Sequence, residues 1–465
     1  MVTTDCCNIV KICRCARGPL PYLRSSSNVL EAAELTTPTV CRQSGIMSKM
    51  RLPAVPGGIQ PDSTRSRSQT TPGGTKVVRT PATPLTLHHD RFLPVAEPDL
   101  STLEESMVMA AVQSGWVSSL GEYIGRFEAE FAEFCGTRYA VSTCNGTAAL
   151  HLALAAGGVG PGDEVIVPAL TFVATAAAVK HAGATPVFVE CEPEIGTMHP
   201  AAIEGAVSSQ TKAIIPVHLF GHPADMDPII AIADKHGLLV IEDAAEAHGA
   251  TYKGRVTGSL GKAGCFSFYG NKIMTTGEGG MITSDDESYV KHLRLLRDHA
   301  MDSKRRYWHP EVGFNYRLTN PQAAMGVAQL ARFSEISEKR RRLLSNYRAV
   351  VADMKLPLVL NPSREWAVPT PWLVCAILDE SIDPSRREHV LAELKSSGID
   401  TRNYFIPLHL LPPYQECRTV GLNGAGLPET ESLASRGFNL PSSGGLSKDD
   451  VRRVGKALEA AFASS

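Results

Sequence analysis

Apolar and polar residues alternate from residue 139 onward in a pattern that predicts short buried strands separated by helices. The apolar runs are short and rich in β-branched residues, as expected of buried strands: YAVST (139–143), EVIVPALT (164–171), TPVFVE (185–190), AIIPVHLFG (213–221) and LLVIEDAA (238–245). Helices are predicted between them: NGTAALHLALAAGGVG (145–160), TFVATAAAVKHAG (171–183) and IIAIADKHG (229–237). The alternation predicts an open, largely parallel α/β sheet with helices on both faces.

The segments on either side of this pattern read mainly as helices. Ser101 is a plausible N-cap, with Glu104 three residues later, for a helix through Ser114. A second helix, with apolar residues at helical spacing, is expected between Gly121 and Gly136. After the sheet, helices are predicted at 289–300 and, as one long charged helix, at 321–354. A strand at 372–378 and helices at 384–398 and 448–463 then predict a small α+β domain.

The chain of 465 residues is too long for one ordinary core. Residues 1–92 are rich in Ser, Thr, Pro, Gly and Arg and have little apolar periodicity, so we expect a disordered N-terminal extension. A transit peptide, or an upstream extension with Met47 or Met50 as the true start, are the alternatives. Residues 93–345 are then expected to form a large domain and residues 346–465 a small C-terminal domain.

Composition and charge narrow the class of protein. The net charge of −2 gives no general attraction to nucleic acid or anionic membranes. No apolar stretch approaches the roughly 18 residues that span a bilayer. Five of the eleven cysteines lie in the N-terminal tail, and the other six are scattered singly, as expected of reduced thiols in a cytoplasmic protein. No cysteine spacing indicates a metal site.

One lysine stands in an unusual setting, in GCFSFYGNKIMTTGEGGMIT (264–283). Lys272 lies between an aromatic-rich segment, predicted to be a short strand, and a glycine-rich turn. Most lysines are exposed cations. An amine held in a pocket would instead have a lowered pKa, and its neutral form makes imines. Both interpretations remain open on this stretch alone.

Two further features fall at the carboxyl ends of predicted strands, where parallel sheets bind ligands. Asn145-Gly146-Thr147 precedes a helix whose N-terminus suits a phosphate, although the motif also fits a simple turn and N-cap. Glu242-Asp243 ends an apolar run, where a carboxylate needs a cation or donors, although Asp243 also fits a helix cap. A phosphate cradle, an acid and an imine-forming lysine are together what pyridoxal 5′-phosphate requires.

Three segments carry a resemblance to a known family: EDAAEAHGA (242–250), FSFYGNKIMTTGEGGMITSDD (266–286) and GFNYRLTNPQAAMGVAQL (313–330). They closely resemble the DegT-type aminotransferases that act on nucleotide-linked keto sugars, and the likeness runs from about residue 93 to the C-terminus. The resemblance implies a fold-type I α/β architecture with a mostly parallel seven-stranded sheet. It also implies a smaller C-terminal α+β domain and a homodimer whose active sites are shared across the interface.

The resemblance also implies roles for single residues. Lys272 matches the family's Schiff-base lysine, and Asp243 matches the partner of the pyridine nitrogen. The phosphate ligands match Gly146, Thr147 and Ser267. Family members that dehydrate sugars have histidine in place of the lysine, so Lys272 favours transamination.

Three other positions near the cofactor follow from the same resemblance. Phe172 matches the aromatic residue that stacks on the cofactor ring. Asn315 matches a phosphate ligand contributed by the other subunit. Glu246 stands where many relatives have a glutamine near the phenolic oxygen, and a carboxylate there would repel a phenolate unless it is protonated or compensated.

The expected reaction moves an amino group from L-glutamate to C4 of a nucleotide-linked 4-keto-6-deoxy sugar, with Lys272 carrying the proton. Segments such as QSGWVSSLG and TRNYFIPLHLLPPY look most like members that convert GDP-4-keto-6-deoxy-D-mannose to GDP-perosamine. The residues expected to line the sugar-nucleotide site are Trp116, Ser119, Tyr316, Arg317 and His409. A UDP- or dTDP-sugar aminotransferase and a catalytically silent, cofactor-binding regulatory protein are the alternatives.

Overall fold

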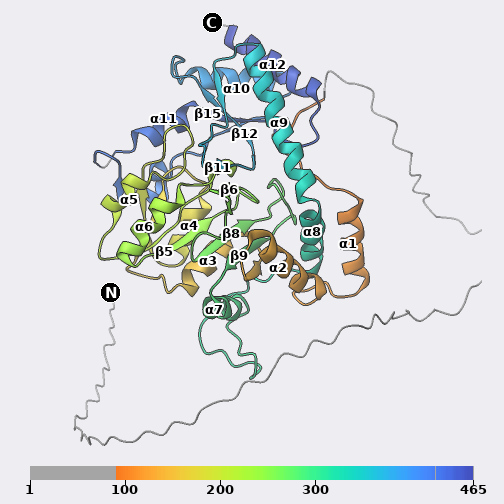
Figure 1. Ribbon diagram of the computed structural model, residues 1–465, viewed down its shortest axis with the longest axis vertical. Helices are drawn as coiled ribbons and strands as arrows, with labels where there is room; N and C mark the ends of the chain where they lie inside the picture. Colours follow the sequence, from red (N-terminus) through yellow and green to blue (C-terminus); the bar gives the residue numbers. More distant parts are fainter. Residues whose placement is uncertain (1–90, 425, 464–465) are drawn as a thin grey trace, which may run out of the picture. The chain divides into compact units, whose positions relative to one another are not determined.

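The computed structural model describes residues 91–424 and 426–463, which belong to one compact unit spanning Thr83–Ser465 (Figure 1). The prediction for residues 1–92 therefore lies outside the described residues, apart from 91 and 92. No helix within the described ranges combines the length and the apolar character needed to cross a membrane.

A mostly parallel sheet forms the centre of the unit, with the strand order β1–β9–β8–β5–β4–β2–β3–β14. Its strands are β1 (Tyr139–Thr143), β2 (Glu164–Pro168), β3 (Thr185–Val189), β4 (Thr211–Ile214), β5 (Leu239–Asp243), β8 (Ala263–Ser267), β9 (Gly280–Ser284) and β14 (Thr419–Val420). Only β9 runs antiparallel to its neighbours, β1 and β8. The alternating pattern therefore predicted the sheet correctly.

The sheet is one strand wider than the seven predicted. The additional strand, β14, comes from the C-terminal region and pairs in parallel with β3 through Thr419 and Val420. A strand of two half-buried residues shows no periodicity in the sequence, so its existence depends on tertiary pairing alone.

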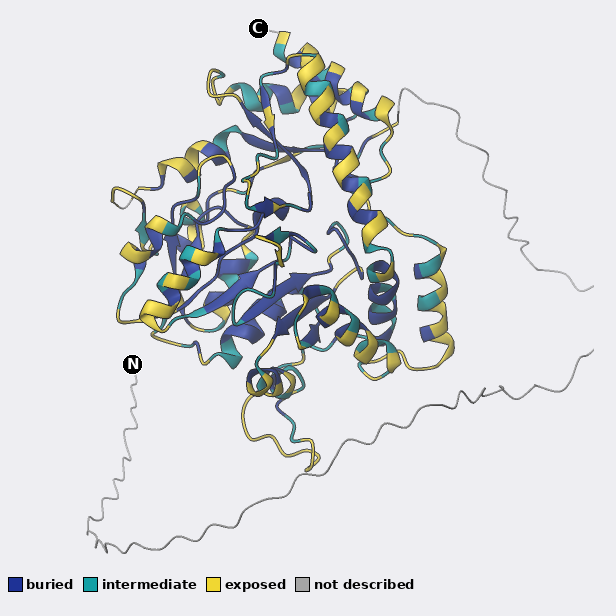
Figure 2. Cartoon of the chain, viewed as in Figure 1, coloured by how far each residue is buried: buried dark blue, intermediate teal, exposed yellow. Residues whose placement is uncertain are grey.

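Helices cover both faces of the sheet because alternate residues of each strand point to opposite sides. Val165 and Val167 of β2 pack with α3 (Gly146–Ala156), α4 (Ala174–His181) and α7 (Glu287–Arg297). Ile166 points the other way and packs with α5 (Pro200–Ala206) and α6 (Met226–His236). Figure 2 shows the strands buried along most of their length, as expected of a sheet covered on both sides.

The long helix predicted at 321–354 is two helices. α8 (Asn320–Ala331) ends at Arg332, whose backbone (φ −103°, ψ 6°) is not helical, and α9 (Phe333–Asp353) begins directly after it. α1 (Thr102–Gln113) and α2 (Glu122–Cys135) pack against α8. Helical periodicity continues across the break, so the sequence pattern gave no sign of it.

A second, antiparallel sheet lies in the C-terminal part, in the order β10–β12–β15–β13. Its strands are β10 (Leu358–Leu360), β12 (Val374–Leu378), β13 (Arg402–Asn403) and β15 (Gly437–Leu440), with α10 (Arg386–Ser396) and α12 (Lys448–Ala463) packed on it. The later turns of α9 and Leu93 belong to the same apolar core. We retain the division into 93–345 and 346–465 as a proposal.

Smaller elements join the two sheets. The ribbon β11–β6–β7 pairs β11 (Ala367–Val368) with the hairpin of β6 (Thr251–Tyr252) and β7 (Arg255–Val256). α11 (Pro428–Arg436) is capped by Glu190, which accepts hydrogen bonds from the backbone N–H and the hydroxyl of Thr430. The turns η2 (Leu408–Leu410) and η3 (Pro412–Tyr414) precede β14.

The strand predicted at 213–221 is shorter than expected. β4 ends at Ile214, and the chain then turns through η1 (Leu219–Gly221), in which Phe220 has a φ of 52°. Pro216 has no N–H to donate to a sheet, which explains why regular pairing stops before it. The turn directs the backbone N–H of Phe220 toward Glu246.

Candidate active site

A cavity of about 390 Å³ lies where β1, β2, β5 and β8 end. The residues that follow or end these strands line it: Asn145, Gly146, Thr147, Thr171, Phe172, Asp243, Glu246, Ser267 and Lys272. The later part of the chain contributes Trp372, Arg402 and Phe405. The carboxyl-end position predicted for the chemistry is therefore the position at which these side chains meet.

The N-terminus of α3 opens into this cavity. Asn145 caps the helix by accepting a hydrogen bond from the N–H of Ala148 at 2.8 Å, and the helix starts at Gly146. A Cβ on Gly146 would stand 2.7 Å from the Cβ of Ser267, so a side chain at position 146 would clash with β8. Backbone donors and a hydroxyl consequently face the same small space, which suits a phosphate.

Asp243 ends β5 and is almost fully buried. One carboxylate oxygen accepts a hydrogen bond from the Thr175 hydroxyl at 2.8 Å, and the other accepts one from the N–H of Ala245 at 3.2 Å. Burial raises the pKa of Asp243, while these two hydrogen bonds act in the opposite direction. The acid is thus fixed in place, facing the cavity.

Lys272 is also buried, and its Nζ lies 3.5 Å from Oε1 of Glu246. Burial lowers the pKa of Lys272, although Glu246 and Asp243 oppose this. Burial raises the pKa of Glu246 to about 6. Glu246 also accepts a hydrogen bond from the N–H of Phe220 at 2.8 Å, so its carboxylate is held against the amine. Lys272 is therefore a pocket lysine and not an exposed cation.

Two aromatic residues and an arginine complete the cavity from the C-terminal part. Nζ of Lys272 lies 3.7 Å from the ring centroid of Trp372. Phe172, half-exposed in the cavity wall, contacts Phe405 at a ring-centroid distance of 5.7 Å. The sequence interpretation missed Trp372 and Arg402. Arg402 stands in TRNYFIPLHLLPPY, a segment that the resemblance did single out, whereas nothing around Trp372 marked it.

The residues expected to bind the sugar nucleotide are not among those that line this cavity within one chain. Trp116 and Ser119 lie in the loop between α1 and α2, and Trp116 is exposed. Tyr316 contacts Nδ1 of His151 at 3.0 Å, and Arg317 forms an ion pair with Asp298. His409 contacts Glu431 at 3.1 Å.

Asn315 also lies outside the cavity lining of its own chain. Asn315 is exposed and lies in the loop between α7 and α8. Its backbone forms an isolated antiparallel β-bridge with Asp298. For a residue expected to reach another subunit's cofactor, an exposed position on a loop is compatible with the expectation.

The residues present fit pyridoxal 5′-phosphate. The cofactor needs an anion site for its phosphate, an acid for its pyridine nitrogen and an amine for its aldehyde. The Gly146–Ser267 cradle, Asp243 and Lys272 supply these groups from three strand ends around one cavity.

Known proteins resemble this chain in sequence and in fold. Residues 98–459 match the model of the DegT/DnrJ/EryC1/StrS aminotransferase family. The chain is 46% identical over 369 residues to a GDP-perosamine synthase of Caulobacter vibrioides, covering 78% of this chain and 97% of that protein. It is 38% identical over 371 residues to a GDP-perosamine synthase of Vibrio cholerae, covering 80% and 99%.

One solved structure has a similar fold. The Streptococcus pneumoniae protein Spr1654, described as a sugar aminotransferase and solved in its PLP form, has 27% sequence identity and a TM-score of 0.74. The match covers 80% of this chain and 98% of that one.

Proposed function

Because the chain belongs to the DegT/DnrJ/EryC1/StrS aminotransferase family, we propose that it moves an amino group from L-glutamate to C4 of GDP-4-keto-6-deoxy-D-mannose. The proposed product is GDP-perosamine. Two relatives named GDP-perosamine synthase, each covered almost completely, support the choice of sugar nucleotide. The observation that carries the proposal is the meeting of Lys272, Asp243 and the Gly146–Ser267 cradle in one cavity.

The enzyme is dependent on pyridoxal 5′-phosphate, as aminotransferases of this family are. When bound, this cofactor acts as an electron sink for the bonds at the amino-acid Cα. The backbone of Gly146 and Thr147 and the hydroxyl of Ser267 would hold the phosphate. Asp243, fixed by Thr175, would keep the pyridine nitrogen protonated. Phe172 would stack on the ring.

Lys272 has two tasks in the proposed mechanism. With the cofactor bound, its amine would hold the cofactor aldehyde, and once released Nζ would take the proton from the Cα of the amino donor. In the second half-reaction, the same atom would give a proton to C4 of the sugar. A general base must be neutral near the working pH, and the burial that lowers the pKa of Lys272 favours this form.

Glu246 and Arg402 are given supporting roles. With its pKa raised to about 6, Glu246 is protonated more readily than an ordinary glutamate, which reduces the repulsion expected beside a phenolate. Arg402 lines the cavity and is exposed, so its guanidinium is available to a carboxylate of the amino donor.

The proposed enzyme is a homodimer with shared active sites. Several large apolar side chains are exposed on the loops that carry the expected substrate residues, including Trp116, Leu120, Tyr307 and Val312. Covering them with a second copy would remove this apolar surface from water and bring Asn315, Tyr316 and Arg317 to the partner's cavity. Trp116, Ser119 and His409 are proposed to line the sugar-nucleotide site of the assembled dimer.

Mixed dimers test the shared site. Lys272→Ala and Asn315→Ala chains, each impaired alone, should recover about a quarter of wild-type activity when equal amounts are refolded together, because half of the dimers are then mixed and each mixed dimer has one site with both residues intact. If the mixture stays inactive while forming dimers, the shared-site proposal is wrong.

We propose a cytoplasmic reaction, which the free cysteines of the described residues favour.

Product analysis tests the reaction itself. Purified enzyme with L-glutamate should convert GDP-4-keto-6-deoxy-D-mannose to a product with the mass of GDP-perosamine, detected by mass spectrometry. UDP- and dTDP-linked keto sugars serve as parallel substrates, and faster turnover of either would overturn the proposed nucleotide. A silent regulatory protein would give no product and no shift of the cofactor absorbance with glutamate.

A further inference from the structure

A buried arginine outside the cavity reaches the main chain of Lys272. Arg340 lies in the second turn of α9 and is 3% exposed. Its guanidinium donates hydrogen bonds to the carbonyl oxygen of Trp372 at 2.6 Å and to the carbonyl oxygen of Lys272 at 3.4 Å. Two segments that lie about a hundred residues apart in the chain are therefore joined by one side chain.

Burying the guanidinium of Arg340 costs free energy of folding. Burial lowers the pKa of Arg340 to about 10, and Asp99, acting through space, opposes this. Within the described residues, no carboxylate lies at ion-pair distance from this guanidinium; both of its contacts are to neutral carbonyl groups. A buried charge without a counter-ion disfavours folding, so the two hydrogen bonds to carbonyl groups have to offset this cost.

The two segments that Arg340 joins are also those that contact each other at the amine. Nζ of Lys272 lies over the ring of Trp372, and Nε1 of Trp372 donates a hydrogen bond to the carbonyl oxygen of Asn271 at 2.8 Å. Arg340 thus fixes the backbone on both sides of the amine–indole contact. The position of Nζ depends on this arrangement because the lysine side chain has four rotatable bonds.

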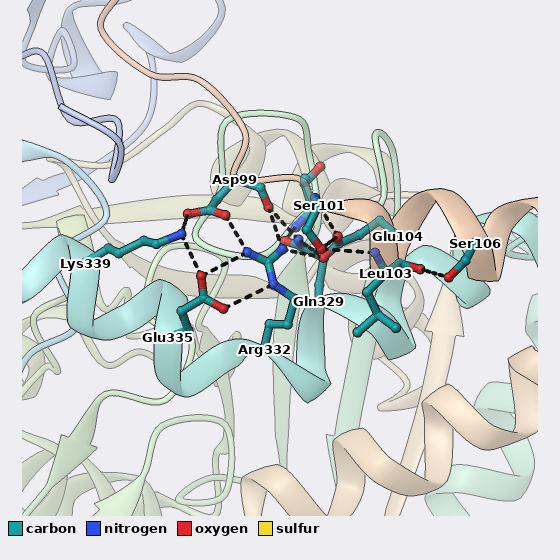
Figure 3. A network of polar contacts seen from close by, with 10 residues as sticks. Asp99, Ser101, Leu103, Glu104, Ser106, Gln329, Arg332, Glu335 and Lys339 are labelled. Atoms are coloured by element: carbon teal, nitrogen blue, oxygen red, sulfur yellow. Dashed lines mark hydrogen bonds and ion pairs between the residues drawn. The ribbon is translucent and has the colours of Figure 1, made fainter.

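An ion network lies at the start of α9, next to Arg340 in the chain. Arg332 forms ion pairs with Asp99 and Glu104, and Lys339 forms ion pairs with Asp99 and Glu335, as Figure 3 shows. The network joins the segment before α1 to the α8–α9 junction. Lys339 extends toward this network, and the adjacent Arg340 extends toward Lys272.

We propose that Arg340 is a positioning residue for the amine of Lys272, acting through the carbonyl groups of Lys272 and Trp372. The proposal rests on the role given above to Lys272. Without Arg340, the two segments separate, and the amine loses its fixed place beside Glu246 and the indole ring. Water then reaches the amine, and its titration moves toward that of an ordinary lysine.

Other charged groups face the same amine, and they must stay unchanged in the test. Glu246 and Asp243 favour its charged form, and Arg402 disfavours it. His248 is fully buried nearby, and its own pKa is lowered to about 3 by burial, so it stays neutral at the pH of the test.

The test measures the titration of Lys272 in cofactor-free protein. Competitive acetylation across a pH series, read by mass spectrometry of the Lys272 peptide, gives the pH at which the amine becomes reactive. Arg340→Met should raise this midpoint by at least about one unit, which lowers the neutral amine about tenfold at neutral pH. Arg341→Met changes the next residue of the same helix, which is exposed, and should leave the midpoint unchanged.

Two further variants separate positioning from general stability and from charge. Tyr347 lies in the same helix as Arg340 and donates a buried hydrogen bond to the carbonyl oxygen of Pro441, so Tyr347→Phe should lower the melting temperature without moving the midpoint. Arg340→Lys keeps the charge, but its compact ammonium cannot span both carbonyl groups, so its midpoint should follow that of Arg340→Met.

Three results would overturn the proposal: a wild-type midpoint in Arg340→Met, a wild-type midpoint in Arg340→Lys, or the same shift in Tyr347→Phe. If Arg340→Met does not fold, Arg340→Lys alone decides between the outcomes. Failure of the proposed function is seen separately. Borohydride reduction of wild-type protein with pyridoxal 5′-phosphate would then leave Lys272 unlabelled, whatever its titration.

Discussion

The hydroxyl of Thr175 donates a 2.8 Å hydrogen bond to the carboxylate of Asp243. Thr175 lies in the first turn of α4, the helix that follows β2. In the sheet, β2 is two strands away from β5, whose last residue is Asp243. Thr171 contacts the same hydroxyl at 3.1 Å, so the donor itself is held in place. The acid proposed to face the cofactor nitrogen is therefore fixed by the loop and helix that follow β2.

Asp243→Asn should lower kcat about 100-fold or more, because a neutral amide cannot hold a proton on the pyridine nitrogen. Steady-state kinetics with saturating cofactor measures the loss. Thr175→Val is the matched control, since it removes the hydrogen bond and leaves the charge; its loss should be much smaller. Equal losses in both variants would show that orientation alone matters at this position.

Lys272→Ala should remove the covalent attachment and at least about 1,000-fold of the activity, because it deletes the proposed general base. The attachment is measured by borohydride reduction and peptide mass spectrometry. Lys262→Ala affects a surface lysine paired with Asp286 and should leave both readouts unchanged. Turnover retained in Lys272→Ala would contradict the assignment.

Gly146→Ala should weaken pyridoxal 5′-phosphate binding at least about tenfold, because the added Cβ meets Ser267 at 2.7 Å. Equilibrium dialysis or absorbance titration measures the dissociation constant. Gly125→Ala makes the same change in α2, where a Cβ would meet nothing within 4 Å. There we expect unchanged binding and up to about 1 kcal/mol of added stability. Equal affinity in both variants would argue against a phosphate site at Gly146.

Glu246 should make the cofactor-free protein less stable as the pH rises. Its pKa is raised from 4.5 to about 6 on folding, so the folded state binds the proton more tightly. This stabilisation is complete below pH 4.5 and is lost as the pH passes 6, which is worth about 2 kcal/mol. Urea unfolding between pH 4 and 8 should show this loss in the wild type and not in Glu246→Gln. Parallel profiles would contradict it.

Arg402→Met should raise the KM for L-glutamate about tenfold or more and change kcat little, since the lost contact holds the donor and does not take part in proton transfer. The comparison requires the first half-reaction, followed by absorbance as glutamate concentration is varied. Arg418→Met, which removes an exposed arginine paired with Glu164, is the control. A fall in kcat with unchanged KM would assign Arg402 a different role.

The parts of the structure that local patterns determine were predictable. The apolar run of β2, the capping residues of α1 and the glycine at the end of α2 all lie in or next to the element they define. The same holds for the strand-end residues Asp243 and Lys272, because a parallel sheet brings its carboxyl ends together.

The features that could not be predicted depend on contacts between residues far apart in the sequence. At the break between α8 and α9, Arg332 forms ion pairs with Asp99 and Glu104, more than two hundred residues earlier. Trp372 reaches Lys272 from a separate sheet, and β14 exists only because β3 offers an edge. The roles proposed for Asn315 and Arg317 require a second chain, and sequence reasoning reached that proposal only through family resemblance.

Leu93 packs with residues 343–461, and Thr419–Val420 borders the sheet built by residues 139–284. Each part of the structure thus contains a segment from the far end of the chain. During synthesis on a ribosome, which proceeds from the N-terminus, β3 emerges before its neighbour β14. Leu93 likewise emerges before the residues between 343 and 461 that it packs against. The unit can close only after nearly the whole chain has emerged, so its folding is expected to be post-translational in its last step.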